Sequence, residues 1–330
     1  MTERPLYLTD LNPQTHYGLN HELYCIVDAL MIGHFTGRDI MTTGFYPDYN
    51  GPVTIPLSDV LDLEETNRKL REMGILSKLH DFAPLETWTD SQYINPVFRP
   101  EFLKLPGNRR FTEMISALLN EKAAKEPRVN LWTTFVWPFM TPFDYDPLLT
   151  KISVQIFCCL TLSEKMEQGV KTRLARTIGS DQSYYVCHLR LEDDWVNHLS
   201  TVLENPHRGN SFEDISRSIF QEIVTYIENE CQDKKIFIAT GLGKSEQRNN
   251  FYLDKLQEMF PDRLFIDRKT YQNWGEIYPG VKFGRELEGL IDYTICQRAE
   301  KLILAWYSSF SVSLKYFCAE KGIPVRSYMG

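Results

Sequence analysis

In the second half of the chain, short apolar runs alternate with longer segments in which apolar residues recur every three or four positions. Short runs rich in Ile, Leu, Val and Phe predict buried parallel strands, and the longer segments predict amphipathic helices. Regular alternation of this kind predicts an α/β domain with a parallel sheet. The expected order is strand 184–187, helix 212–229, strand 236–239, helix 246–260, strand 264–266, helix 285–300, strand 302–305, helix 309–320 and strand 323–325.

The first half opens with a similar unit. A strand at 5–8, a polar loop, a helix with Leu23, Val27 and Leu30 on one face, and a strand near 40–41 form a β-loop-α-β pattern, which is typical of doubly wound sheets. The loop lacks Gly-x-Gly-x-x-Gly, so no dinucleotide fingerprint is present there. Further helical patterns lie near 61–73, 111–125 and 147–176, with a buried strand and turn at 132–138.

Length and composition favour two globular domains. The chain has 330 residues, of which 43% are hydrophobic and 24% are charged, and a chain of this size exceeds one typical core. We place the boundary near 177–182 and expect domains at 1–180 and 181–330. The formal net charge of −8 makes nucleic acid a poor candidate partner, because a polyanion meets repulsion on average.

The cysteines and the first residues bear on location. Seven cysteines are an odd number, contain no Cys-x-x-Cys pair and lie mostly in apolar segments, so they read as reduced core residues. The opening lacks the pattern of a secretory signal, and no apolar run has membrane-spanning length. These features predict a cytoplasmic protein, although a secretory-pathway chain trimmed of its signal has the same pattern.

The segment after the strand at 184–187 carries an unusual density of charge. It reads His188-Leu189-Arg190-Leu191-Glu192-Asp193-Asp194-Trp195, and ligands of open α/β sheets bind at the carboxyl ends of strands. Arg190 suits a pyrophosphate, because its guanidinium donates two parallel hydrogen bonds. A structural ion pair with Asp193 or Asp194 is an equally good interpretation of the spacing alone, and a single strand-end histidine is more often structural.

Three other segments are candidates. Ser308 and Ser309 open a helix after a buried strand, where hydroxyls and helix N–H groups can hold phosphate; considered alone, ordinary N-capping is the better explanation. Glycines in 240–244 permit a ligand to approach the backbone closely, but the Walker spacing is missing. Asp292 lies among apolar neighbours, and considered alone it is most simply explained by a solvated helix face.

Together these segments resemble the O-fucosyltransferase-type glycosyltransferases, which include protein O-fucosyltransferases, core fucosyltransferases and bacterial nodulation fucosyltransferases. His188-Leu189-Arg190 followed by Asp194-Trp195 is similar to the family's His-Leu-Arg motif with its later Asp-Trp. Gly18-Leu19-Asn20 is similar to its Gly-Phe-Asn loop. Asp292, then a strand, then Ser308-Ser309-Phe310 resembles its closing motif, in which the Asp recognises guanine or nearby backbone and the Ser-Ser-Phe turn holds phosphate. The resemblance spans nearly the whole chain, and its joint motifs favour function over the separate alternatives.

The resemblance implies an α/β GT-B architecture of two facing Rossmann-like domains, with the donor bound mainly by the second. It also implies metal-independent transfer of fucose from GDP-fucose to a glycan or protein hydroxyl, with inversion at the anomeric carbon and no cofactor. Without a metal, Arg190 and the helix dipole at Ser308 must stabilise the departing GDP. We expect catalysis by Arg190, Glu22 and Asn20, and donor binding by Gly18, Leu19, Asn20, His188, Arg190, Asp194, Thr240, Asp292, Ser308, Ser309 and Phe310.

The chain departs from the family at the catalytic base. In one protein-modifying branch a Glu precedes the Gly-Phe-Asn loop, and here that position is Tyr17. His16, His21 and Glu22 are nearby candidates, and a dissociative transition state needs little help from a base. Two alternatives therefore remain: a GT-B enzyme that uses another nucleotide sugar, and a binding protein without turnover. We expect the loops at 43–110 and 196–212 to select the acceptor.

Overall fold

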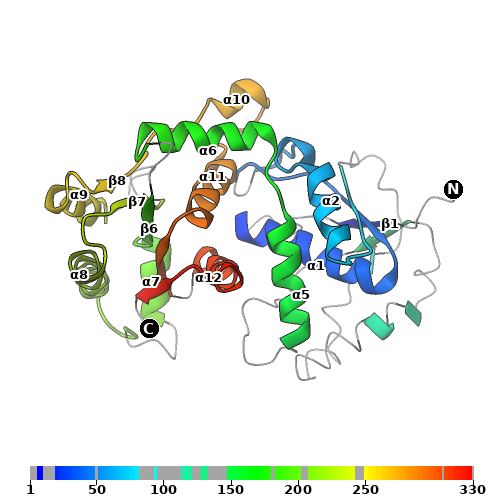
Figure 1. Cartoon of the computed structure of the whole chain (residues 1–330), viewed down its shortest axis with the longest axis horizontal. Coiled ribbons are helices and arrows are strands. Elements are labelled where there is room, and N and C mark those ends of the chain that lie inside the picture. Colours follow the sequence, from blue (N-terminus) through cyan, green and yellow to red (C-terminus); the bar gives the residue numbers. More distant parts are fainter. Residues whose placement is uncertain are drawn as a thin grey trace. The chain divides into compact units, whose positions relative to one another are not determined.

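The computed structural model describes residues 6–9, 19–48, 51–81, 93–94, 113, 115–117, 119–120, 128–131, 147–179, 183–201, 207–241, 249–306 and 308–328, and the statements below concern these residues. The chain divides into two compact units (Figure 1). The first comprises Met1–Gly169 and Gln272–Ile291, and the second comprises Val170–Tyr271 and Asp292–Gly330. The chain therefore enters the first unit twice, and the predicted domain ranges 1–180 and 181–330 stay a prediction.

The first unit contains a parallel sheet in the order β3-β2-β1-β5-β4. Leu6 of β1 aligns with Asp39 of β2 and with Arg128 of β5, so β1 is the central strand. The strands are β1 (Leu6–Thr9), β2 (Asp39–Thr42), β3 (Leu79–His80), β4 (Tyr93–Ile94) and β5 (Arg128–Leu131). The helices are α1 (Leu19–Thr36), the short 3-10 helix η1 (Leu57–Asp59), α2 (Leu63–Glu72), α5 (Pro147–Cys159), α10 (Trp274–Ile277) and the first turns of α6 (Glu164–Arg176) and α11 (Arg285–Gln297).

Helix α1 is the buried helix of the first unit. Apolar residues surround its axis, and every position from Leu19 to Gly33 is buried, which is expected of a helix covered on all sides. It packs against α5, where the Ser153 hydroxyl lies 2.6 Å from Met31 Sδ. Near its end, Gly33 lets α1 approach the segment that leads into β2, because a Cβ atom there would lie 2.6 Å from the Arg38 carbonyl oxygen.

The second unit contains a parallel sheet in the order β10-β9-β6-β7-β8. The strands are β6 (Tyr184–His188), β7 (Lys235–Ala239), β8 (Leu264–Phe265), β9 (Lys301–Ala305) and β10 (Val325–Tyr328). The helices are α7 (Asp193–Thr201), α8 (Phe212–Glu230), α9 (Asn250–Met259), α12 (Ser309–Lys321) and the remaining turns of α6 and α11. Helices α8 and α9 cover one face of this sheet, and α12 lies on the other (Figure 1).

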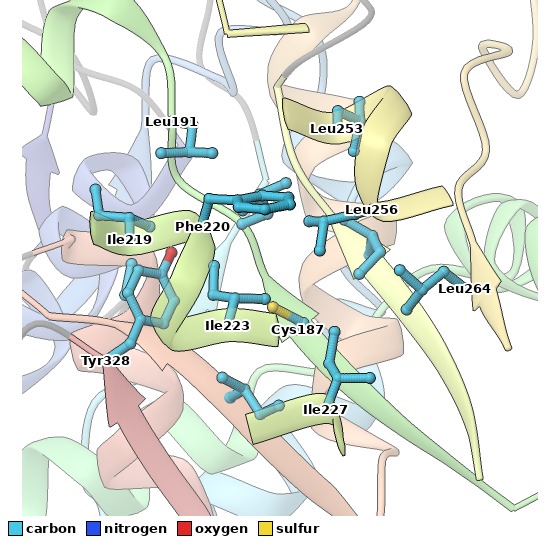
Figure 2. Packing of buried hydrophobic residues seen from close by; sticks show 14 of the residues in the cluster. Cys187, Leu191, Ile219, Phe220, Ile223, Ile227, Leu253, Leu256, Leu264 and Tyr328 are labelled. Carbon is cyan, nitrogen blue, oxygen red and sulfur yellow. The ribbon is translucent and has the colours of Figure 1, made fainter. Parts of the chain in front are cut away.

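The core of the second unit lies between α8, α9 and the sheet. Ile219, Ile223 and Ile227 recur every four residues along α8 and are fully buried, so they form one stripe. Figure 2 shows this stripe packed with Leu253 and Leu256 of α9. The Ser211 hydroxyl caps α8 by accepting the Asp214 N–H at 3.2 Å. The stripe packs against Cys187 of β6 and Ile238 of β7, the strands whose ends carry the candidate site.

The α/β alternation predicted from the sequence is confirmed, with two corrections. The helical pattern at 147–176 is two helices, because residues 160–163 interrupt it. The segment at 193–201 is helix α7, so the expected acceptor loop at 196–212 is wrong for its first six residues. The predicted strand at 132–138 and residues 246–248 of the predicted helix lie outside the described residues, as do parts of the helix near 111–125.

Two further observations bear on the sequence predictions. All seven cysteines are free, and six of them are buried while Cys158 is half-buried, as expected of reduced core residues. Among the helices that the structure describes, none combines the length and the apolar character needed to cross a membrane.

Candidate active site

The topology of the second unit singles out one edge of its sheet. β6 is central, with β7 on one side and β9 on the other. After β6 the chain first forms the strands on the β7 side and then returns to form those on the β9 side, so the strand order reverses at β6. Ligands of open parallel sheets bind at such a switch point, outside the carboxyl ends of the strands. The residues that follow β6, β7 and β9 include Arg190, Gly241 and Ser308. The predicted second-domain candidates therefore gather at one edge from three separate parts of the sequence.

Arg190 lies in the turn between β6 and α7 and faces two carboxylates. Its Nη2 donates to Asp194 Oδ2 at 3.1 Å, and its Nη1 lies 3.5 Å from Glu192 Oε1. The Asp194 side chain is 71% exposed, whereas the Glu192 side chain is 9% exposed. The ion pair with Asp194 foreseen from the spacing is present, and Glu192 is a second partner that the sequence did not single out. A guanidinium with exchangeable surface contacts is suited to an anionic ligand.

Glu192 connects the ends of β6 and β7. Its Oε1 accepts the Gly241 N–H at 2.9 Å. A Cβ atom at position 241 would lie 2.5 Å from that same oxygen, so a glycine is needed for this approach. Nearby, Asn249 donates from Nδ2 to the Leu191 carbonyl at 2.7 Å. These bonds hold the β6–α7 turn against the β7 end.

Tyr328, the last described residue, clamps the same turn from β10. Its hydroxyl donates to the His188 carbonyl at 2.8 Å and accepts the Arg190 N–H at 2.9 Å. The side chain is fully buried. One hydroxyl thus binds the His188 carbonyl and the Arg190 N–H, which lie on either side of Leu189. These two bonds position the Arg190 main chain. Sequence reasoning missed Tyr328, because a tyrosine at the end of a short strand carries no signal of this contact.

His188 is a buried, neutral part of this scaffold. Its Nδ1 lies 2.7 Å from the Ser311 hydroxyl, and its ring packs on Phe310 with centroids 4.4 Å apart. Burial lowers the pKa of His188 to about 3, and the nearby Arg190 charge lowers it further while Asp292 opposes the shift. Helix α12 is thereby held at the end of β6. These contacts fit the structural interpretation of His188 better than direct contact with a ligand.

The amino terminus of α12 shows that Ser308 is not an ordinary cap. Ser308 is the N-cap residue, with an extended backbone at φ −84° and ψ 129°, and its carbonyl accepts the Val312 N–H at 2.9 Å. Its side chain makes no capping hydrogen bond, although the residue is only 6% exposed. The capping interpretation is therefore wrong for the Ser308 hydroxyl. Because the first N–H groups of a helix lack intrahelical acceptors, this end favours an anion.

Asp292 is buried and ion-paired, so the solvated-face explanation is wrong. Its Oδ1 lies 2.5 Å from Nη1 of Arg173, a residue of α6 with no exposed side-chain surface. Arg173 and Arg176 also pair with Asp267, at 3.5 Å and 2.6 Å. The apolar neighbours of Asp292 gave no hint of this partner, which lies more than a hundred residues away. The pair keeps a carboxylate close to His188 and the site edge.

The first-unit candidates are placed only in part. Gly18, Tyr17 and His16 lie outside the described residues. Leu19 and Asn20 begin α1 and are buried, and the Leu19 N–H donates to Glu286 Oε2 at 2.5 Å. Glu22 is fully buried, and its Oε2 accepts the Tyr46 N–H at 2.8 Å.

The remaining candidates follow from their elements. Thr240 directly follows β7 and is 8% exposed, so it lies beside the Glu192–Gly241 contact. Ser309 and Phe310 form the first turn of α12, and Phe310 also meets Tyr293 of α11 edge-on at 5.0 Å. Within the described part of the chain, no group of three or more His, Cys, Asp or Glu side chains is arranged to hold a metal ion.

Comparisons with known proteins identify the family of the chain. The model of the family described as GDP-fucose protein O-fucosyltransferase matches residues 106–316, which is more than half of the chain and includes β6 through the start of α12. No curated protein matches the chain in sequence.

Solved structures share the fold. A crystal structure of POFUT1 in complex with GDP-fucose has a TM-score of 0.62 at 12% identity, with 98% of each chain covered. A crystal structure of the fucosyltransferase NodZ from Bradyrhizobium has a TM-score of 0.53 at 12% identity, covering 95% of this chain and 93% of that one. NodZ α-1,6-fucosyltransferase soaked with GDP-fucose gives 0.57 at 13% identity, covering 96% and 93%. The predicted GT-B class, with two Rossmann-like units and parallel sheets, is confirmed, and the chain is a glycosyltransferase that belongs to the GDP-fucose protein O-fucosyltransferase family.

Proposed function

We propose that this protein transfers fucose from GDP-fucose to a hydroxyl group of a glycan or protein acceptor, without a metal and with inversion at the anomeric carbon. The observation that carries the proposal is the family match over residues 106–316, combined with Arg190 and a Ser308 hydroxyl that makes no capping hydrogen bond at the same sheet edge. The structures of POFUT1 and NodZ that share the fold were determined with GDP-fucose.

The chemistry requires stabilisation of a departing diphosphate. The bond between the anomeric carbon and the phosphate oxygen breaks, the acceptor oxygen bonds to the opposite face of that carbon, and the acceptor proton leaves. We propose that Arg190 and the first turn of α12, with Ser308, Ser309 and Phe310, hold the developing charge on GDP. Asp292, fixed by Arg173, is placed in this proposal as the acceptor for guanine N–H groups, and Thr240 and Asp194 border the donor.

The first unit supplies the proposed acceptor side. Asn20 and its neighbours Gly18 and Leu19 are proposed to contact the reacting groups. Glu22 is fully buried and bonded to the Tyr46 N–H, so we assign it the task of supporting this segment rather than direct proton abstraction. An oxocarbenium-like, loose transition state reduces the demand for a base.

Calorimetric titration with GDP, GDP-fucose, GDP-mannose and UDP, each with and without EDTA, tests the donor. Binding of GDP and GDP-fucose that EDTA leaves unchanged supports the proposal, whereas preference for UDP or loss of binding in EDTA contradicts it. Inversion is tested by NMR, which identifies the anomer of the sugar first released to water.

Arg190→Ala tests the site itself, with Arg217→Ala on the exposed face of α8 as its matched control. Loss of one charge-stabilising donor typically lowers turnover about 100-fold to 1,000-fold. We expect that loss for Arg190→Ala only, with both thermal midpoints near that of the parent. Equal turnover in the two variants contradicts the assignment.

A further inference from the structure

Arg190 is held between two carboxylates that differ in burial. Glu192 is almost enclosed, with a side chain 9% exposed, whereas Asp194 is 71% exposed. We propose that Glu192 is a positioning residue for Arg190: it holds the Nη1 side of the guanidinium when a diphosphate takes the Nη2 side from Asp194. The inference rests on the proposed function, because it assigns a task within the same donor site.

Glu192 and Arg190 lie close together in this structure but do not form a strong hydrogen bond. Nη1 of Arg190 lies 3.5 Å from Glu192 Oε1, which is too long for a strong hydrogen bond. Among the described residues, Arg190 Nε and Glu192 Oε2 are both buried and have no hydrogen-bond partner. One donor and one acceptor therefore remain unused on the same two side chains. Glu192 therefore has an acceptor left for the guanidinium in addition to the oxygen that binds the Gly241 N–H.

Burial decides which carboxylate gives way to the ligand. An exposed ion pair such as Arg190–Asp194 is worth about 0–1 kcal/mol, so a diphosphate displaces it readily. Glu192 cannot leave without exposing its own buried charge and releasing the Gly241 N–H. The ligand thus replaces Asp194, and Glu192 fixes the direction in which the guanidinium points.

The residues that contact Glu192 and Arg190 support the positioning role of Glu192. Gly241 accommodates the carboxylate, since a Cβ there would lie 2.5 Å from Oε1. Tyr328 fixes the Arg190 main chain through the N–H bond of 2.9 Å. With its backbone clamped and one face of its side chain gripped, Arg190 presents its remaining donors toward the edge where Ser308 lies.

The test is a double-mutant cycle on GDP binding, measured by calorimetry. Glu192→Gln keeps an acceptor for the Gly241 N–H and removes the charge. We expect a loss of GDP affinity of about 10-fold, equivalent to about 1.4 kcal/mol. In the Arg190→Ala background the same substitution is expected to have no further effect, because its action passes through Arg190. Glu228→Gln, on the exposed face of α8, is the matched control and leaves affinity unchanged.

Each outcome bears on one claim. Unchanged GDP affinity in Glu192→Gln, or an equal loss with and without Arg190, overturns the positioning role while the donor site stands. Failure of the parent protein to bind GDP removes the proposed function and this inference with it. Thermal unfolding checks the fold of each variant. If Glu192→Gln is unfolded, Glu192→Asp replaces it, because the shorter carboxylate retracts from Arg190 yet keeps its charge, and the same expectations apply.

Discussion

Two serine residues at helix starts differ in what their hydroxyl groups bind. Ser211 and Ser308 both begin helices, and only the Ser211 side chain accepts a capping hydrogen bond. A serine at the start of a predicted helix suggests a cap in either case, because the capping preference of serine is a property of its residue type. Only the geometry shows that the Ser308 side chain makes no capping hydrogen bond.

Ser308→Ala and Ser211→Ala form a matched pair. Ser211→Ala should lower the free energy of unfolding by about 1 kcal/mol, the usual effect of losing a cap, without changing GDP affinity. Ser308→Ala should leave unfolding nearly unchanged and weaken GDP binding by roughly 3-fold to 10-fold, the contribution of one hydrogen bond. Denaturant unfolding and calorimetry measure the two quantities. A stability loss in Ser308→Ala with intact binding contradicts the assignment.

His188 makes stability depend on acidity. Burial lowers its pKa to about 3, whereas in the unfolded chain it titrates near 6.5. Between these values the unfolded state binds a proton that the native state lacks, so stability rises with pH and is lost as pH falls from about 6.5 toward 3. Burial lowers the pKa of His21 to about 4, which adds a contribution of the same sign.

We expect His188→Asn to flatten the pH dependence. Asn keeps a polar atom near the Ser311 hydroxyl and cannot bind the proton. Between pH 6 and 4 the parent should lose about 2–3 kcal/mol more stability than the variant, since a full proton corresponds to about 1.4 kcal/mol per pH unit. Denaturant unfolding at several pH values gives the slopes. Parallel slopes for parent and variant rule out a neutral buried His188.

At the scale of elements, the residues that form the candidate site lie at the ends of strands. Tyr328 joins β10 to the β6–α7 turn through two hydrogen bonds. Tyr328→Phe removes both and leaves the buried Arg190 N–H without its acceptor, which costs about 1–3 kcal/mol. Because the Arg190 backbone then moves more freely, GDP affinity should fall as well.

Thermal unfolding and calorimetry on Tyr328→Phe test this clamp. Tyr226→Phe is its control, since the Tyr226 hydroxyl reaches only Glu222 and, at 3.5 Å, the Ser327 carbonyl. Loss of stability without loss of affinity would show that β10 supports the sheet and not the site.

The elements also show how far sequence reasoning reaches. The strands of the second unit were predictable, because buried parallel strands are short continuous apolar runs. Helix α7 was not predicted, although Trp195, Val196 and Leu199 give it an apolar face. The charged residues at 192–194 made this segment resemble a ligand-binding turn. Arg173 and Glu192 were not predictable as partners, since ion pairs between distant segments leave no local pattern.

At the scale of the whole molecule, the acidic chain concentrates its candidate phosphate contacts in the second unit. The net charge is −8, yet Arg190 and the α12 amino terminus meet at one edge of one sheet. Any ligand that binds the native state alone stabilises it, by about 2.7 kcal/mol when its concentration is 100 times the dissociation constant. The stabilisation should appear where the ligand is held.

Hydrogen exchange measured by mass spectrometry locates that effect. With saturating GDP we expect added protection in peptides from the β6–α7 segment, 184–201, and from β9 and the start of α12, 301–316, because their turns and helix N–H groups lie at the proposed site. UDP at the same concentration should protect them less, since uracil cannot make the guanine contact proposed for Asp292. Arg190→Ala should weaken the protection at both segments at the same GDP concentration. Protection confined to peptides of 19–48 would instead move the nucleotide site to the first unit and overturn the assignment of the donor to β6, β9 and α12.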